Sequence, residues 1–228
     1  MAHNAERTSR WTAGFAAVRN YIASAPVTYA WLAILLVTTI VQHRLSPSAL
    51  NTVLGERSTN LAHLASDPLH VLVSSLFWID GGRWLPYLVL FSIFHATAER
   101  WLGAWRWLAV GLTAHVLATY ISEGSLAIAI DRGMANPALV DTRDIGVSYF
   151  LAGVIGVLTY HVAGRWRWVY LAAVLIVYGT PLLVDLNFTA VGHFSSVLIG
   201  LAFYPITRGR GEPIDPVQVY RGRRRQTV

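Results

Sequence analysis

The sequence contains no cysteine and no lysine, and charged residues of either sign are scarce. Without cysteine there is no disulfide, no thiolate nucleophile and no thiolate metal site, so any chemistry must come from other side chains. Of the 228 residues 13% are charged and 54% are hydrophobic, which is typical of a chain embedded in lipid and not of a soluble enzyme. Residues 1–24 are too polar for the apolar centre of a secretory signal, so we expect no cleavage.

Six apolar runs follow one another along the chain, at residues 26–42, 84–102, 105–122, 145–162, 166–184 and 191–206. A helix of about 20 residues crosses the hydrocarbon core of a bilayer, so we predict an all-α polytopic bundle of six transmembrane helices. Five arginines then fall in outer loops and the other thirteen on the cytoplasmic side, as the positive-inside rule requires. We therefore expect a multi-pass protein of the plasma membrane with both termini in the cytoplasm, and the use of arginine without lysine is typical of a GC-rich bacterial genome.

Three segments are predicted from this pattern. Residues 1–25 form a cytoplasmic amino-terminal segment, in which the apolar residues between Arg10 and Ile22 recur at helical spacing and favour a helix on the membrane surface. Residues 26–206 form the membrane domain. Residues 207–228 form a basic, disordered cytoplasmic tail that binds anionic lipid through its arginines, and we expect no nucleic-acid partner.

The predicted outer loop between the first two spans, residues 43–83, is too long for a simple linker. Asp67 followed by Pro68 is a good helix start, because the carboxylate can cap the helix and proline fits the first helical position. The apolar run that follows ends at Ile79 and is too short to span, so this helix should lie in the outer interface. Such a loop either gates access to a site or covers apolar surface.

Ionisable residues within the spans are costly and therefore candidates for function. His95 and Glu99 lie four residues apart on one helix face, which favours a structural role in which the Glu99 carboxylate accepts hydrogen bonds from His95 or from the neighbouring backbone. His115 lies near mid-membrane and is interpreted as a core histidine bonded to a neighbouring helix. His161 lies at the cytoplasmic boundary, where we expect it to be solvated.

Ser148 and His193 differ from these residues because each lies about one turn inside the outer surface. Each begins a helix face that continues in small residues, which lets two helix backbones approach closely. These are Ala152 and Gly156 after Ser148, and Ser196 and Gly200 after His193. A serine hydroxyl beside an imidazole is a nucleophile with its base.

Three segments of the chain resemble motifs of the rhomboid intramembrane serine proteases: Gly146-Val147-Ser148, residues 192–200, which begin Gly-His-Phe-Ser, and Glu99-Arg100-Trp101-Leu102-Gly103. The resemblance covers about residues 26–206 and implies that Ser148 is the nucleophile and His193 its base. It gives Glu99, Gly103, Gly146, Ser196 and Gly200 the positions of structural motif residues, and we expect Gly103 to let a neighbouring helix or loop pack tightly. It implies no metal and no other cofactor.

Several positions depart from the family motifs, as in a divergent branch of the kind found in actinobacteria. Tyr149 and Ser196 stand where the family has glycine, and Ala152 stands where a tyrosine often stacks on the histidine. The family's oxyanion-binding pair is also missing. Where the family has this pair, the chain has Arg83 and Tyr87. Either side chain could donate a hydrogen bond to the oxyanion, in addition to the Ser148 backbone amide.

The resemblance implies hydrolysis, within the membrane, of transmembrane segments of other membrane proteins by Ser148 and His193. The alternative is a non-catalytic rhomboid-like protein that binds transmembrane helices of client proteins. A transporter is the third interpretation, because His115 and Glu99 could relay protons, but paired internal repeats are missing from the sequence.

Overall fold

The computed structural model describes residues 14–215 and 217, and this part of the chain is helical, with one isolated parallel bridge and no sheet. The six apolar runs all lie in helices. Their bounds are α2 (Pro26–Gln42), α6 (Trp84–Leu90) with the π turn η3 (Phe91–His95) and α7 (Ala96–Leu102), α8 (Ala104–Asp131), α9 (Val147–Val157) with η5 (Leu158–His161), α10 (Gly164–Val184), and α11 (Phe188–Ala202) with α12 (Tyr204–Thr207).

Short helices fill the connections at one end of the bundle, which we call the loop end and define as residues 43–83 and 132–146. The first connection forms α3 (Pro47–Glu56), α4 (Leu61–Ser66), α5 (Pro68–Ser74), η1 (Ser75–Phe77) and η2 (Asp80–Gly82); the second contains η4 (Pro137–Asp141). The predicted helix start is confirmed, since Asp67 Oδ1 accepts from the His70 N–H at 3.3 Å. The α-helix ends at Ser74, short of the expected Ile79.

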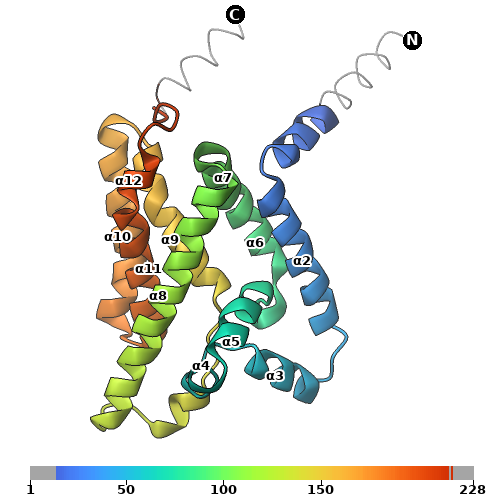
Figure 1. Ribbon diagram of the computed structural model, residues 1–228, viewed down its shortest axis with the longest axis vertical. Coiled ribbons are helices and arrows are strands. Elements are labelled where there is room, and N and C mark those ends of the chain that lie inside the picture. The colour runs from blue at the N-terminus through green and yellow to red at the C-terminus, as the bar shows by residue number, and fades with distance from the viewer. Residues whose placement is uncertain (1–13, 216, 218–228) are drawn as a thin grey trace, which may run out of the picture.

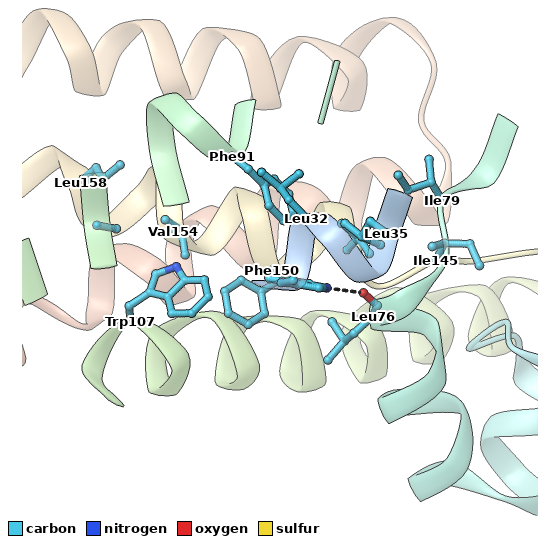
Figure 2. Packing of buried hydrophobic residues seen from close by; sticks show 13 residues of the cluster. Leu32, Leu35, Leu76, Ile79, Phe91, Trp107, Ile145, Phe150, Val154 and Leu158 are labelled. Atoms are coloured by element: carbon cyan, nitrogen blue, oxygen red, sulfur yellow. Dashed lines mark hydrogen bonds between the residues drawn. The ribbon is translucent and has the colours of Figure 1, made fainter. Parts of the chain in front are cut away.

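Helices α8, α9 and α11 pack together as the centre of the bundle, with α10 against α11 on one side and α2 and α6 on the other (Figure 1). The largest buried cluster lies between α2, η3, α8, α9 and the loop end (Figure 2). Within it the Trp31 indole Nε1 donates to the Leu76 carbonyl at 2.8 Å. This bond fastens the segment 75–77 to α2, so the long connection is part of the core.

Helices α9 and α11 approach to backbone contact. A Cβ atom added to Gly200 would overlap the Gly153 carbonyl oxygen, and one added to Gly156 would overlap that of Val197. Close approach through small residues is thus confirmed at Gly156 and Gly200, and Gly153, which was not predicted, takes part in it as well. The contacts with α11 come from Tyr149, Gly153 and Gly156, and Ala152 lies in a cluster that joins Val174 of α10 to Val197 of α11.

By length and composition, α10 is the helix of the described chain that could cross a membrane by itself. The helix Gly14–Ala23 and α2 are together long and apolar enough to form one span, but they meet at an angle of 95°. The other apolar segments are shorter, interrupted by the π turn, or more polar, as α8 is. The described residues therefore contain one or two candidate spans, and the count of six rests on the sequence pattern.

Both ends of the described chain lie at the end of the bundle opposite the loop end (Figure 1). The helix Gly14–Ala23 coincides with most of the predicted surface helix, whose first residues lie outside the described part. The sequence predicts a disordered tail from residue 207, yet Ile214 pairs with the bundle: its N–H donates to the His161 carbonyl at 2.8 Å, and its carbonyl accepts from Ala163 N–H at 3.0 Å. Residues 218–228 lie outside the described part.

Candidate functional site

Ser148 is the second residue of α9 and lies half-buried at the loop end. Its hydroxyl donates to the Ile145 carbonyl at 3.3 Å. The first two backbone hydrogen bonds of the helix are donated by the N–H groups of Tyr149 and Phe150, and both are accepted by the Gly146 carbonyl. The Ser148 N–H therefore has no backbone acceptor within the described chain, as is usual for the first residues of a helix.

His193 lies in the second turn of α11, a helix that Asn187 caps by accepting from the Ala190 N–H at 2.9 Å. Its imidazole lies between two tyrosines, with ring centroids 4.9 Å from Tyr149 and 6.2 Å from Tyr178. On the α10 side it lines a cavity of about 320 Å³. His193 is therefore reachable from a cavity between α10 and α11.

Tyr149 ties three helices together beside these two residues. Its buried hydroxyl lies 3.1 Å from the hydroxyl of Ser122 on α8, and its backbone carbonyl accepts a hydrogen bond from Ser196 of α11. A Cβ on Gly192 would overlap the tyrosine ring. The side chain that replaces the expected glycine thus fills the space beside His193, and Ser196 has a structural role.

Ser148 and His193 lie at the same end of two helices in backbone contact, and the residue after the serine touches the imidazole. The hydrogen bonds of the described residues do not include one between Ser148 and His193. The dyad therefore stays a prediction. So does the oxyanion role of Arg83, which is exposed, and of Tyr87, which packs on Phe91 with ring centroids 6.0 Å apart.

Gly146 is required by close packing. A Cβ there would overlap the imidazole of His115 and crowd the hydroxyl of Ser75. His115 is a bonded core histidine, as predicted, although its Nε2 donates at 2.9 Å to the Leu72 carbonyl in α5 and not to another long helix. Gly146 therefore allows His115 of α8 and Ser75 of the loop end to pack directly against the start of α9.

The predicted pairing of His95 with Glu99 is wrong, whereas the alternative, backbone donors to the Glu99 carboxylate, is confirmed. His95 Nδ1 accepts from the indole of Trp107 at 3.0 Å. The Glu99 carboxylate instead accepts two backbone N–H groups at the start of α2, from Val27 at 3.0 Å and from Thr28 at 2.8 Å. Glu99 is thus a buried helix cap that joins α7 to α2.

Two other residues also differ from expectation. Gly103 has open space around its missing Cβ, so it does not allow tight packing; instead its φ of +83° ends α7 in a conformation that favours glycine. His161 is half-buried and lies on Trp101, with ring centroids 4.6 Å apart, so it is not freely solvated.

A buried acidic pair, Asp144 before the start of α9 and Glu123 on α8, was not predicted from the sequence. Asp144 and Glu123 are 4% and 1% exposed, and neither oxygen of the Glu123 carboxylate has a hydrogen-bond partner within the described chain. The Asp144 backbone is held by Ser58 and Thr59: the Thr59 N–H donates to its carbonyl at 2.9 Å, and its N–H donates to Ser58 Oγ at 2.7 Å. Asp144 therefore links the first connection to the start of α9.

This pair predicts that stability depends on pH. Burial raises the pKa of Asp144 from 3.8 to about 7, partly opposed by hydrogen bonds from Tyr149 and Thr59. Because the raised pKa favours the neutral carboxyl in the folded state, the stabilisation is complete below about pH 4 and is lost as the pH rises through 7. We expect the melting temperature in detergent to fall by roughly 5 °C between pH 5 and 8. Asp144→Asn should flatten this slope, and an unchanged slope would contradict the assignment.

The described residues contain no group of three or more histidine, aspartate or glutamate side chains that could hold a metal ion. What the site offers chemically is a half-buried hydroxyl, an imidazole that lines a cavity, and a free backbone N–H at the start of α9. These groups are sufficient for acyl transfer if the hydroxyl and the imidazole come within hydrogen-bond reach.

Comparison with known families gives one finding. The model of a family described as "Rhomboid-like protein" matches residues 20–213, which include every helix from α2 to α12. Neither the curated proteins nor the solved structures contain a match to this chain. The family match thus covers both the helix that carries Ser148 and the one that carries His193.

Proposed function

Because the chain belongs to the rhomboid-like family, and is thus a membrane protein, we propose that it is an intramembrane serine protease acting through Ser148 and His193. The observation that carries the proposal is the contact between α9 and α11, with Tyr149 of one helix against His193 of the other. Formation of the dyad would require the Ser148 hydroxyl to leave the Ile145 carbonyl and to come within hydrogen-bond reach of the imidazole.

In the proposed reaction, Ser148 Oγ forms a bond to the carbonyl carbon of a peptide bond in a transmembrane segment while its proton passes to His193. The carbon–nitrogen bond then breaks, and the leaving nitrogen takes the proton from His193. A water molecule next attacks the acyl ester, giving one proton to His193, which returns it to Ser148 Oγ. The Ser148 N–H, free at the start of α9, supports the oxyanion, with Arg83 or Tyr87 as the further donor.

The proposed orientation puts the loop end outside a bacterial plasma membrane and both termini in the cytoplasm, with six membrane passes. The arginine distribution supports it, as does the location of both described chain ends at one end of the bundle. The partners would be transmembrane proteins, with anionic lipid at the basic tail.

A second candidate is a non-catalytic protein that binds transmembrane helices. The surface of α10 favours it, because Val174 is the one buried residue of this fully described helix, and Ile176 and Leu183 are 66% and 89% exposed. Such a face can take another apolar helix without any reaction. The hydrogen bond from the Ser148 hydroxyl to the Ile145 carbonyl also fits a serine with a purely structural role.

Labelling with a fluorophosphonate probe separates the two candidates. We expect the purified protein in detergent to be labelled on Ser148, and labelling to fall to background in Ser148→Ala and in His193→Ala. Ser66→Ala, which removes an exposed hydroxyl bonded within α4, is the matched control and should label as the wild type does. Folded wild type that resists labelling would favour the binding protein.

A further inference from the structure

A polar pocket lies at the loop end, apart from Ser148 and His193. It has a volume of about 280 Å³ and is bounded by the end of α2, one side of α3, the turn η2 and Arg143. This is near the lower limit of roughly 300 Å³ for small-molecule pockets, enough for a short piece of a larger ligand. Nothing in the proposed reaction uses it.

Gln42, the last residue of α2, forms the polar wall of this pocket. Its side chain is 3% exposed, yet neither the amide nitrogen nor the amide oxygen has a hydrogen-bond partner within the described chain. A buried amide without partners is unfavourable, so its retention points to a partner that comes from outside the chain.

Gly82 leaves the space next to the Gln42 amide oxygen without a side chain. Its φ is +61°, and a Cβ atom there would lie 3.5 Å from Gln42 Oε1 and 3.3 Å from the His43 ring. A residue other than glycine would be strained by this φ, and its Cβ would take up space beside the amide. The His43 Nδ1–H is already donated to Thr39 O at 2.8 Å, which leaves Nε2 as a hydrogen-bond acceptor near the pocket.

The charges at the pocket have both signs. The Arg143 guanidinium lies 3.8 Å from the Asp80 carboxylate, and both side chains line the pocket and are partly exposed. Leu50 and Leu54 supply an apolar portion of the wall. A simple anion or cation would meet a like charge here, whereas a neutral group with a donor and an acceptor side by side would not.

We propose that this pocket binds a stretch of extended peptide backbone, whose N–H and C=O pair with the oxygen and nitrogen of the Gln42 amide. The ligand would be the segment that flanks the transmembrane helix of a client protein. This identification of the client rests on the proposed function, which requires membrane-protein partners. The pocket lies at the loop end, where α9 and α11 also begin, so one client could reach both sites.

The test observes the Gln42 amide directly in the full-length protein. The chain has three glutamines, Gln42, Gln218 and Gln226, so selective ¹⁵N labelling of glutamine gives three side-chain amide signals. Titration with N-acetylalanine N-methylamide should shift the Gln42 signal with a Kd of about 1–10 mM, as expected for so small a ligand, and should leave the other two unmoved. N-acetylproline dimethylamide lacks an N–H and should bind at least tenfold more weakly.

Two variants complete the test. Gln42→Leu assigns the signal by removing it. If that variant fails to fold, Asn51→Trp replaces an exposed residue of the pocket wall, and we expect it to fill the pocket and abolish the shift. Equal shifts from both probes, or no shift at about 100 mM probe, would overturn the proposal. Labelling of Ser148 is measured separately, so an unmoved Gln42 signal in a labelled protein refutes peptide binding while leaving the protease in place.

Discussion

Gly200→Ala is expected to destabilise the protein by about 3 kcal/mol or more, because the added methyl group would overlap the Gly153 carbonyl oxygen in the backbone of α9. A flexible side chain could rotate away, but a helix backbone can only separate, and separation would loosen the whole α9–α11 contact. For a chain of this size the melting temperature in detergent should fall by roughly 10 °C. Since that contact lies beneath Ser148 and His193, probe labelling of the surviving folded protein should also fall.

Gly124→Ala on α8 is the matched control. The position is helical, and an added Cβ would meet nothing within 4 Å. Alanine is the better helix former by about 1 kcal/mol, so this variant should be as stable as the wild type or slightly more so. If the two alanine variants melted at the same temperature, α9 and α11 would not be in backbone contact, and the geometric support for the dyad would be lost.

Helix positions could be predicted because lipid-exposed and buried helices both need long apolar runs. The run 26–42 coincides with α2, and the run 84–102 with the segment from α6 through α7. For the same reason, helical residues beyond an apolar run were not predicted. Helix α8 continues nine residues past its apolar run, to Asp131. The helices α3 and α4 were not predicted, since they are short and stabilised by packing and caps rather than by an apolar pattern.

Partners of buried polar groups could not be predicted in the same way. Spacing shows which residues share a helix face, but not which other segment meets that face. Ser148 shares a face with Ala152 and Gly156, and Gly156 does meet α11, but at the start of α9 the contact with α11 is made by Tyr149. Likewise the four-residue spacing of His95 and Glu99 suggested a pair, whereas each bonds to a different helix.

Glu99→Ala should be the most destabilising change outside the α9–α11 contact. The first turn of α2 has no capping side chain of its own, because its N-cap residue is Ala25. The N–H groups of Val27 and Thr28 therefore depend on the Glu99 carboxylate, which is 4% exposed. A hydrogen bond to a charged group contributes about 1.5–3 kcal/mol, so losing both should lower the melting temperature by roughly 10 °C.

Comparison with two further variants identifies the cause. Glu99→Gln keeps one acceptor oxygen but turns an NH₂ group toward a backbone donor, so its stability should lie between wild type and Glu99→Ala. Glu56→Ala removes an exposed carboxylate 3.4 Å from Arg57, and surface pairs of this kind contribute at most about 1 kcal/mol. Folded Glu99→Gln protein should still react with the fluorophosphonate probe at the wild-type rate, because the carboxylate acts on α2 and not on Ser148. A variant of unchanged stability that no longer reacted would instead make Glu99 part of the mechanism.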